Sequence, residues 1–234
     1  RRQRQMCIRD RLDTLAEEFI RDHGAIPTFK GFPNPYGSDF PASICTSVNE
    51  VVVHGIPNDT PLKDGDIVSV DCGTLIDGFC GDSCYTFCVG EVDDKTKALL
   101  KTTKESLYKA IEQALPGHRL GDIGHAVQSH CEAQGYGVVR EFVGHGIGHE
   151  MHEDPQVPNY GQRGTGKQIK NGLCIAIEPM ITMGNPSLYM LDDRWGVVTR
   201  DGLPAAHFEH TIAIHHGKAD LMSSFEQIEE IERQ

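Results

Sequence analysis

The stretch DIVSVDCGTLIDGFCGDSCYTF, residues 66–87, constrains the fold more than any other part of the sequence. Asp77-Gly78 near its middle is a strong signal for a two-residue hairpin turn. With this turn, position 76 faces 79 and position 73 faces 82, so Asp71 and Asp82 lie diagonally on one face of the hairpin. Their Cα atoms are then roughly 7–8 Å apart. Two carboxylates directed at one spot repel each other unless cations lie between them.

Two glutamates lie in similarly apolar surroundings. Glu178 follows the run LCIAI and precedes a proline, and Glu209 lies within AAHFEHTIAI. Carboxylates are costly in buried strands unless they are paired or bound to metal. Taken singly, each glutamate has a simpler interpretation as an edge-strand or ion-paired residue, and the two aspartates as hydrated residues beside a turn. The place of Asp71 at the end of the apolar run IVSV argues against full exposure.

The segment GHGIGHEMHEDP, residues 144–155, contains three histidines. It does not match the zinc-protease helix motif H-E-x-x-H, because the string HEMH, residues 149–152, is one residue too short. Two glycines between His145 and His149 also argue against a helix. We expect a glycine-rich, β-type segment that presents His145 to a neighbouring group.

The four acids and His145 are more informative together than any one of them alone. Four carboxylates and one imidazole, all in strand-like contexts, suit a pair of divalent cations such as Mn, Fe, Co or Zn. Carboxylates can bridge two such ions, and two ions roughly 3.5–4 Å apart can hold a hydroxide nucleophile between them. The residue types alone therefore predict a dinuclear metal hydrolase, without specifying its substrate.

Composition excludes other classes of protein. The net charge of −12 argues against a nucleic-acid-binding surface, and no apolar run approaches the roughly 20 residues that a membrane span needs. The eight cysteines are interpreted as reduced cytosolic thiols, since the chain is long and shows no signal peptide. Cys80, Cys84 and Cys88 are evenly spaced, which favours small buried side chains on one face of a strand over a metal site.

Strand-like runs flank a helical block. Apolar residues recur at helical spacing over residues 12–23 and 94–115, and Asp122 is expected to cap a further helix in which His125 and His130 are ordinary residues. Strands are expected in the segments VNEVVVHG, DIVSVDCG, FCGDSCYTFCVG, VVREFVGHG, GLCIAIEPM, WGVVTRDG and HFEHTIAIHHG. Strands, then helices, then strands predict an α+β domain with helices packed on an antiparallel sheet.

The chain divides into three parts. Residues 12–217 are expected to form a single catalytic domain. Residues 1–11, RRQRQMCIRDR, carry five arginines and match nothing that follows, so they are interpreted as a non-native or disordered leader. Residues 218–234 are expected to form an acidic helical tail.

The chain resembles the type I methionine aminopeptidases, in the creatinase-like or pita-bread group of metallopeptidases. The matching stretches are CTSVNEVVVHGIP, VDCG…DGFCGDS, GHGIGHEMHEDPQVPNYG, IAIEPM and FEHTIAI, in family order between about residue 12 and residue 215. The resemblance implies the pita-bread fold and removal of the N-terminal methionine from nascent proteins and peptides whose second residue is small. It also implies a cytoplasmic monomer that meets nascent chains at the ribosome and binds neither nucleic acid nor membranes.

The resemblance also implies roles for residues. It implies a pair of divalent cations (Co, Mn, Fe or Zn) held by Asp71, Asp82, His145, Glu178 and Glu209. Glu178 would act as general base and then acid, His152 would stabilise the oxyanion, and His54 would hold the peptide amide or the leaving amine. His149 falls where the family has no ligand. A monovalent cation would bind backbone carbonyls near Asn49, Val51 and Ala205.

The methionine pocket implied by the resemblance combines aromatic and sulfur-containing side chains, which suit a thioether: Phe29, Phe32, Phe40, Cys45, Met151 and Trp195. The chain departs from the family pattern at two places. The segment PNPYGSD, residues 33–39, is longer than the pattern, and the family's first long helix is missing ahead of Leu12.

Two other interpretations stay open. Prolidases and aminopeptidases P have similar five-ligand sites, but they usually carry an extra N-terminal domain. A non-enzymatic binding module of the same fold would be expected to have lost ligands. The interval between Glu178 and Glu209 is too short for the helical insert of type II methionine aminopeptidases.

Overall fold

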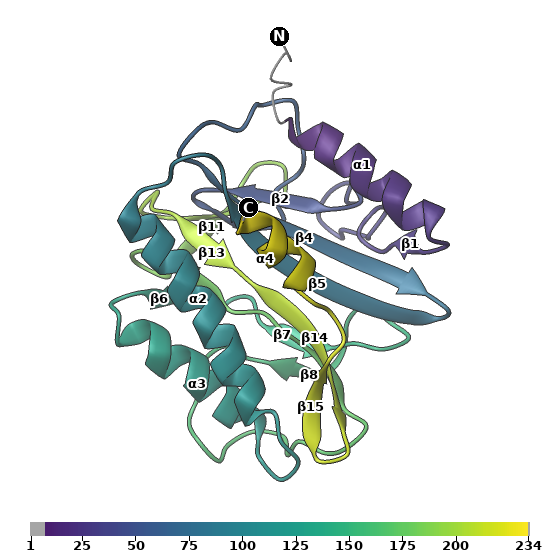
Figure 1. The fold of residues 1–234 in the computed structure, drawn as a ribbon, viewed down its shortest axis with the longest axis vertical. Helices are drawn as coiled ribbons and strands as arrows, with labels where there is room; N and C mark the ends of the chain where they lie inside the picture. Colours follow the sequence, from purple (N-terminus) through teal and green to yellow (C-terminus); the bar gives the residue numbers. More distant parts are fainter. Residues whose placement is uncertain (1–7, 234) are drawn as a thin grey trace.

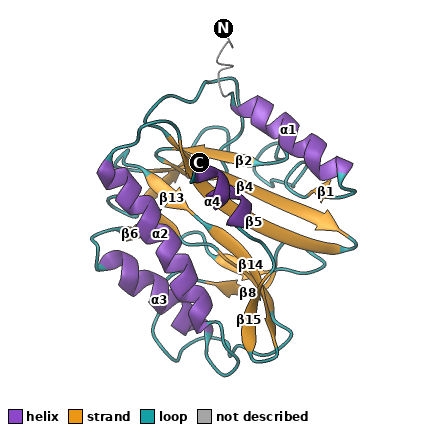
Figure 2. Cartoon of the chain, viewed as in Figure 1, coloured by secondary structure: helices purple, strands orange, loops and turns teal. Residues whose placement is uncertain are grey.

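The computed structural model describes residues 8–233, which form an α+β fold (Figures 1 and 2). The helices are α1 (Arg9–Asp22), α2 (Asp94–Gln113), α3 (Leu120–Glu132) and α4 (Glu226–Glu232). The strands are β1 (Ile26–Pro27), β2 (Cys45–Val48), β3 (Val51–Val53), β4 (Ile67–Ile76), β5 (Phe79–Cys88), β6 (Gly137–Val138), β7 (Gly144–Gly146), β8 (Glu153–Val157), β9 (Cys174–Ile177), β10 (Met180–Thr182), β11 (Leu188–Met190), β12 (Val197–Thr199), β13 (Ala205–His207), β14 (Glu209–His215) and β15 (Lys218–Leu221).

The strands of the described chain pair antiparallel throughout. The largest sheet has nine strands in the order β1-β4-β5-β14-β9-β7-β8, with β15 added to β14 and β2 added to β4. Two three-stranded sheets, β13-β10-β6 and β11-β12-β3, complete the β-structure. The nine-stranded sheet thereby places strands from the two ends of the chain next to each other.

Strands β4 and β5 form the hairpin that the Asp77-Gly78 turn predicts. Asp77 and Gly78 have φ angles of 50° and 83°, the positive values that a two-residue turn of this type requires. Gly73 pairs with Asp82, so Asp71 and Asp82 lie diagonally on the same face of the hairpin, as predicted.

Helices α2 and α3 lie side by side against one face of the sheet (Figure 1). The core between them and the strands is made of Leu99, Leu107, Ile123, Val127, Ile175, Ile177, Phe208 and Ile212. Because neighbouring residues of a strand face opposite sides, Ile212 of β14 points to this core while Glu209 and Thr211 point to the other face. The polar residues of the alternating strands therefore gather on the face that these two helices leave uncovered.

The helices α2 and α3 begin in different ways. Asp93 caps α2 by accepting hydrogen bonds from the backbone N–H groups of Lys95 and Thr96. Asp122 lies inside the first turn of α3, and its carboxylate accepts from the N–H of Arg119 at 2.7 Å. Asp122 therefore caps α3 as expected, but from the third helical residue, because α3 begins at Leu120 and Arg119 is the N-cap. In the described part of the chain, each helix is too short or too polar to cross a lipid bilayer.

The ends of the catalytic domain differ from the sequence-based boundaries. Helix α1 begins at Arg9, and Arg9 and Asp10 both bond to Asn58, so residues 8–11 belong to the fold and the boundary at residue 11 does not hold. The rest of the expected leader, residues 1–7, lies outside the described residues. At the other end, residues 218–221 form β15 beside β14, and only residues 226–232 of the expected tail are helical.

Candidate active site

The nine-stranded sheet brings the predicted acids together. Asp71 on β4 and Glu209 on β14 both pair with Cys84 on β5. Directly paired residues share a face of the sheet, so Asp71 and Glu209 flank Cys84 on one face, and Asp82 shares that face two residues away. Glu178 directly follows β9, the other neighbour of β14. Four acids that are up to 138 positions apart in the sequence thus meet at one place.

Thr211 holds Asp82 in position. The Asp82 N–H donates to Thr211 Oγ1 at 2.9 Å, and the same hydroxyl donates to the Asp82 carbonyl oxygen at 2.8 Å. Regular pairing of β5 with β14 covers only the two residue pairs before this point. The threonine side chain thereby extends the link between the two strands and fixes Asp82 beside Glu209.

His145 lies on the short strand β7, as the glycine-rich pattern predicts. A Cβ on Gly144 would meet the carbonyl of Ala176, and a Cβ on Gly146 would meet the carbonyl of Asp154. Only glycines therefore allow β7 to fit between β9 and β8. The Nδ1 atom of His145 lies 2.9 Å from the Gly146 carbonyl oxygen, which makes Nδ1 the protonated nitrogen and leaves Nε2 free to accept or to bind metal.

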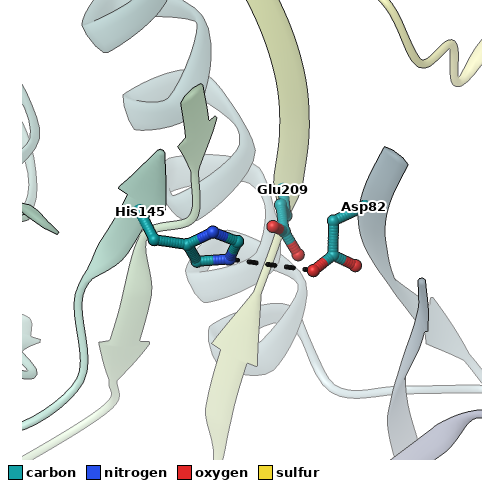
Figure 3. A group of neighbouring side chains, drawn as sticks. All are labelled: Asp82, His145 and Glu209. Atoms are coloured by element: carbon teal, nitrogen blue, oxygen red, sulfur yellow. Dashed lines mark ion pairs between the residues drawn. The ribbon is translucent and has the colours of Figure 1, made fainter. Parts of the chain in front are cut away.

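The side chains of Asp82, His145 and Glu209 point toward one another from β5, β7 and β14 (Figure 3). Their ligand atoms all lie within 4.8 Å of one another. His145 Nε2 is 3.8 Å from Asp82 Oδ2 and 3.6 Å from Glu178 Oε1. These separations are longer than direct hydrogen bonds. A space therefore remains between the imidazole nitrogen and the carboxylate oxygens.

Burial makes this cluster electrostatically unfavourable without cations. It raises the pKa of Asp82 from an ordinary value of 3.8 to about 7. It also raises the pKa values of Asp71, Glu178 and Glu209 well above their usual range, and the charge of Asp82 adds to the effect at each of them. Desolvation and like charges both disfavour carboxylate anions, so the folded chain holds protons here that a solvated acid would release.

The donor set suits divalent metal ions. Asp71 Oδ1 and Glu209 Oε1 are buried oxygens without a hydrogen-bond partner. Among the described residues, only the histidines His145 and His207 lie within ion-pair distance of the cluster's carboxylates. Buried acids with unpaired oxygens and no neighbouring cationic side chain are the arrangement that a bound cation stabilises.

A cavity of about 230 Å³ opens onto this cluster. Its remaining wall consists of the aromatic, thiol and imidazole side chains Phe29, Phe32, Phe40, Cys45, His54, His152 and Trp195. Phe40 and Trp195 meet edge to face with ring centroids 5.1 Å apart. The cavity is therefore apolar along its walls and acidic where it meets the cluster, which suits a ligand with an apolar side chain beside a polar reacting group.

The three histidines of the segment 144–155 separate in space. The ring of His152 lies 4.3 Å from that of His145, inside the cavity. His149 lies outside it: the ring stacks on Phe79 at 4.5 Å, and Nδ1 is 2.7 Å from the Gly78 carbonyl oxygen. Burial lowers the pKa of His152 to about 4, and His145 adds to this effect, so the imidazole of His152 is neutral at pH 7.

One expected pocket residue lies behind the cavity wall. Met151 is buried, but it does not line the cavity; its sulfur accepts a hydrogen bond from Thr28 Oγ1 at 3.3 Å. The segment 33–39 is fixed against the loop that carries Trp195, whose Nε1–H donates to the Ser38 carbonyl oxygen at 2.9 Å. The longer segment thus leaves Phe32 and Phe40 in the cavity wall.

The cysteines differ in exposure along β5. Cys84 is buried, Cys80 is half-buried and Cys88 is exposed, so the expectation of three buried thiols is wrong for two of them. Cys88 is the last residue of β5. All seven described cysteines are free thiols, and Cys7 lies outside the described residues.

His207 is a site residue that the sequence analysis missed. It ends β13, is 2% exposed, and its Nε2 lies 3.7 Å from Glu178 Oε2. Burial lowers the pKa of His207 to about 3. Its spacing of two residues from Glu209 was the available signal, because residues i and i+2 of an extended segment face the same side.

Comparisons with known proteins identify the family of the chain. Residues 8–216 match the model of metallopeptidase family M24. The methionine aminopeptidase of Clostridium acetobutylicum is 51% identical over 213 residues, which cover 91% of this chain and 83% of that protein. Methionine aminopeptidase 1 of Bacillus subtilis is 50% identical over 212 residues, with 91% and 84% covered.

Solved structures give the same relationship. The crystal structure of methionine aminopeptidase from Rickettsia prowazekii superposes with a TM-score of 0.87 at 45% identity, and the match covers 92% of this chain and 85% of that one. A prolidase from Pyrococcus horikoshii shares only the fold, at 21% identity and a TM-score of 0.71. The expected α+β pita-bread architecture is confirmed. The chain therefore belongs to metallopeptidase family M24, a family of hydrolases, and within it to the methionine aminopeptidases.

Proposed function

We propose that this chain removes the N-terminal methionine from peptides and nascent proteins whose second residue is small. The observation that carries the proposal is the apolar cavity that ends on a buried cluster of four carboxylates and an imidazole. The relatives named methionine aminopeptidase, about half identical over most of the chain, support this choice of substrate.

Two divalent cations, drawn from Co, Mn, Fe and Zn, would be held by Asp71, Asp82, His145, Glu178 and Glu209. The buried, unpaired oxygens of Asp71 and Glu209 support this assignment. Such cations supply Lewis acidity toward a carbonyl oxygen and lower the pKa of water. Backbone carbonyls near Asn49, Val51 and Ala205 would hold a monovalent cation.

Side chains of the protein would carry out the proton transfer, oxyanion stabilisation and amide binding. Glu178, at the junction of the cluster and the cavity, takes the proton of the attacking water and returns it to the leaving amine. His152 donates a hydrogen bond to the oxyanion. His54, whose pKa burial lowers to about 4, is a neutral partner for the peptide amide or the leaving amine.

Substrate choice would follow from the cavity. Phe40, Cys45 and Trp195 form an apolar wall that accepts an unbranched thioether side chain. The second residue of the peptide then lies beside the cluster and His152, where the small cavity leaves little volume. Glycine, alanine and serine fit there, while leucine, phenylalanine, lysine and glutamate clash.

The cellular setting is part of the proposal. We place the protein in the cytoplasm, where the seven described free cysteines would stay reduced. It would act as a monomer on nascent chains close to the ribosome. The net charge of −12 disfavours contacts of its own with nucleic acid.

Three peptides test the proposal, assayed in parallel with Mn or Co present. Met-Ala-Ser should be cleaved readily, Met-Leu-Ser hardly at all, and Ala-Ala-Ser poorly, because it lacks the side chain that fills the apolar cavity. Replacing methionine by leucine at the first position should also cost activity, since an apolar pocket discriminates shape by about 1–3 kcal/mol. Preferential release of X from X-Pro peptides would instead assign the chain to the aminopeptidase P type.

A further inference from the structure

His207 is held rigidly by its backbone. Its N–H donates to Thr86 Oγ1 at 3.0 Å, and its carbonyl oxygen accepts from the same hydroxyl at 2.7 Å. The thiol of Cys84 also donates to that carbonyl oxygen, with sulfur and oxygen 3.6 Å apart. The imidazole therefore projects from a fixed point of β13 and cannot move away without breaking contacts with β5.

The ring nitrogen of His207 that faces the cluster lacks a partner. Its Nε2 is buried and makes no hydrogen bond to any described residue. The atom lies 3.7 Å from Glu178 Oε2, slightly beyond hydrogen-bond distance. The other oxygen of the same carboxylate, Oε1, lies 3.6 Å from His145 Nε2. The Glu178 carboxylate is thus placed between two imidazoles, one on each oxygen.

The two imidazoles have different positions in the cluster. His145 belongs to the group of three side chains whose ligand atoms lie within 4.8 Å of one another, and His207 does not. His207 therefore faces Glu178 from outside that group. A neutral imidazole carries one N–H, and a buried N–H that finds no acceptor is unfavourable. A small rotation of the carboxylate supplies the missing acceptor.

We propose that His207 is a positioning residue for Glu178: its Nε2–H donates a hydrogen bond to Glu178 Oε2 and so keeps Oε1 directed at the reacting groups. This role rests on the proposed function, in which Glu178 transfers the proton. His207 itself neither gains nor loses a proton in the reaction. A general base works only at the correct orientation, so loss of this hydrogen bond affects turnover more than substrate binding.

The kcat values of two variants distinguish the effect of losing the hydrogen bond from the effect of changing the volume of the side chain. His207→Leu keeps an apolar side chain of similar bulk and should lower kcat on Met-Ala-Ser by about 10- to 100-fold, the scale of a misplaced catalytic group, with little change in KM. His207→Gln keeps an N–H donor at a similar distance from the backbone. Its kcat should therefore be close to that of the wild type. Equal kcat values for wild type and His207→Leu, or equal damage in both variants, would overturn the proposal.

His210 of β14 provides a matched control, because it lies three residues after His207 and its side chain points to the opposite face of the sheet. His210 is also buried, but its Nδ1 lies 2.6 Å from Ser223 Oγ and its ring stacks on Phe225. His210→Leu should lower Tm and leave kcat of the folded enzyme unchanged. Calorimetric titration with Mn should give the same number of bound ions per chain for His207→Leu as for wild type, with an affinity lowered by no more than the roughly 10- to 100-fold that loss of a hydrogen bond to a metal ligand costs. Loss of a bound ion would make His207 part of the metal site and overturn the positioning role.

A readout that does not need activity tests the hydrogen bond itself. The zinc-loaded protein should show an exchange-protected imidazole N–H resonance that is lost in His207→Leu and shifts in Glu178→Gln. Absence of this resonance overturns the role of His207 whether or not the enzyme cleaves peptides. A wild-type protein that shows the resonance but releases no methionine overturns the proposed function and leaves the hydrogen bond established.

Discussion

Replacement of a proposed metal ligand, Asp82, by its neutral isostere should stabilise the metal-free protein. In Asp82→Asn a buried carboxylate becomes an amide of nearly the same shape. The pKa of Asp82 in the folded chain is about 7, above its ordinary value of 3.8. Below pH 3.8 both folded and unfolded chains hold the proton, and the group has no effect on stability. As the pH rises from 3.8 to 7, only the unfolded chain releases the proton, so the folded state loses stability.

The size of the effect follows from the same two values. Each pKa unit corresponds to about 1.36 kcal/mol, so the carboxylate destabilises the metal-free fold by about 4 kcal/mol above pH 7. The amide carries no such cost. Asp82→Asn should therefore match wild type near pH 4 and exceed its free energy of unfolding by up to about 4 kcal/mol at pH 8. For a chain of this length the difference corresponds to a rise in Tm of roughly 8–16 °C.

Thermal and denaturant unfolding in the presence of a chelator, at pH values from 5 to 8, measure this difference. Asp59→Asn, at an exposed position, is the matched control and should show no gain. Addition of Mn should reverse the order, because the wild type gains the free energy of metal binding and the variant loses a ligand. A metal-free variant that is less stable than wild type at pH 8, or a gap that does not widen with pH, would refute this account of the cluster.

The remaining predictions concern the histidines and the cavity wall. His152→Ala should lower kcat by roughly 10²-fold with metal content kept, the scale of a lost oxyanion donor, while His149→Ala should leave the kinetics near wild type; the opposite pattern would show that the roles are exchanged. Gly73→Ala should destabilise the fold by about 1–3 kcal/mol and raise KM, because the added Cβ would lie 2.6 Å from Met151 Cε and 2.7 Å from Phe29 Cε1. Unchanged unfolding and KM in that variant would show that the wall behind the cavity is loosely packed.

The parts of the site that local rules determine could be predicted from the sequence. The Asp77-Gly78 turn fixes the register of the hairpin, and the register alone places Asp71 and Asp82 on one face. Glycine spacing predicts the strand that carries His145. In these cases a short stretch contains all the information, because turn type and strand alternation act between near neighbours.

The parts that depend on distant packing could not be predicted in this way. The spacing of His207 from Glu209 indicates only that both face the same side; that His207 faces Glu178 depends on β13 lying beside both β5 and β10. Met151 was placed in the pocket by resemblance, but its sulfur turns to Thr28 behind the wall. The sequence also does not indicate that Asp122 caps α3 from the third helical residue, since the helix begins two residues earlier, at Leu120.

The most direct test of the central claim is the number of divalent ions that the carboxylate cluster binds. Calorimetric titration of the metal-free wild type with Mn, followed by elemental analysis, should give up to two ions per chain, and methionine release from Met-Ala-Ser should rise with occupancy. Asp82→Asn should lose occupancy and turnover together. Full two-ion occupancy with normal turnover in that variant, or a wild type that is equally active after complete removal of metal, would contradict the assignment of this cluster as the reaction centre.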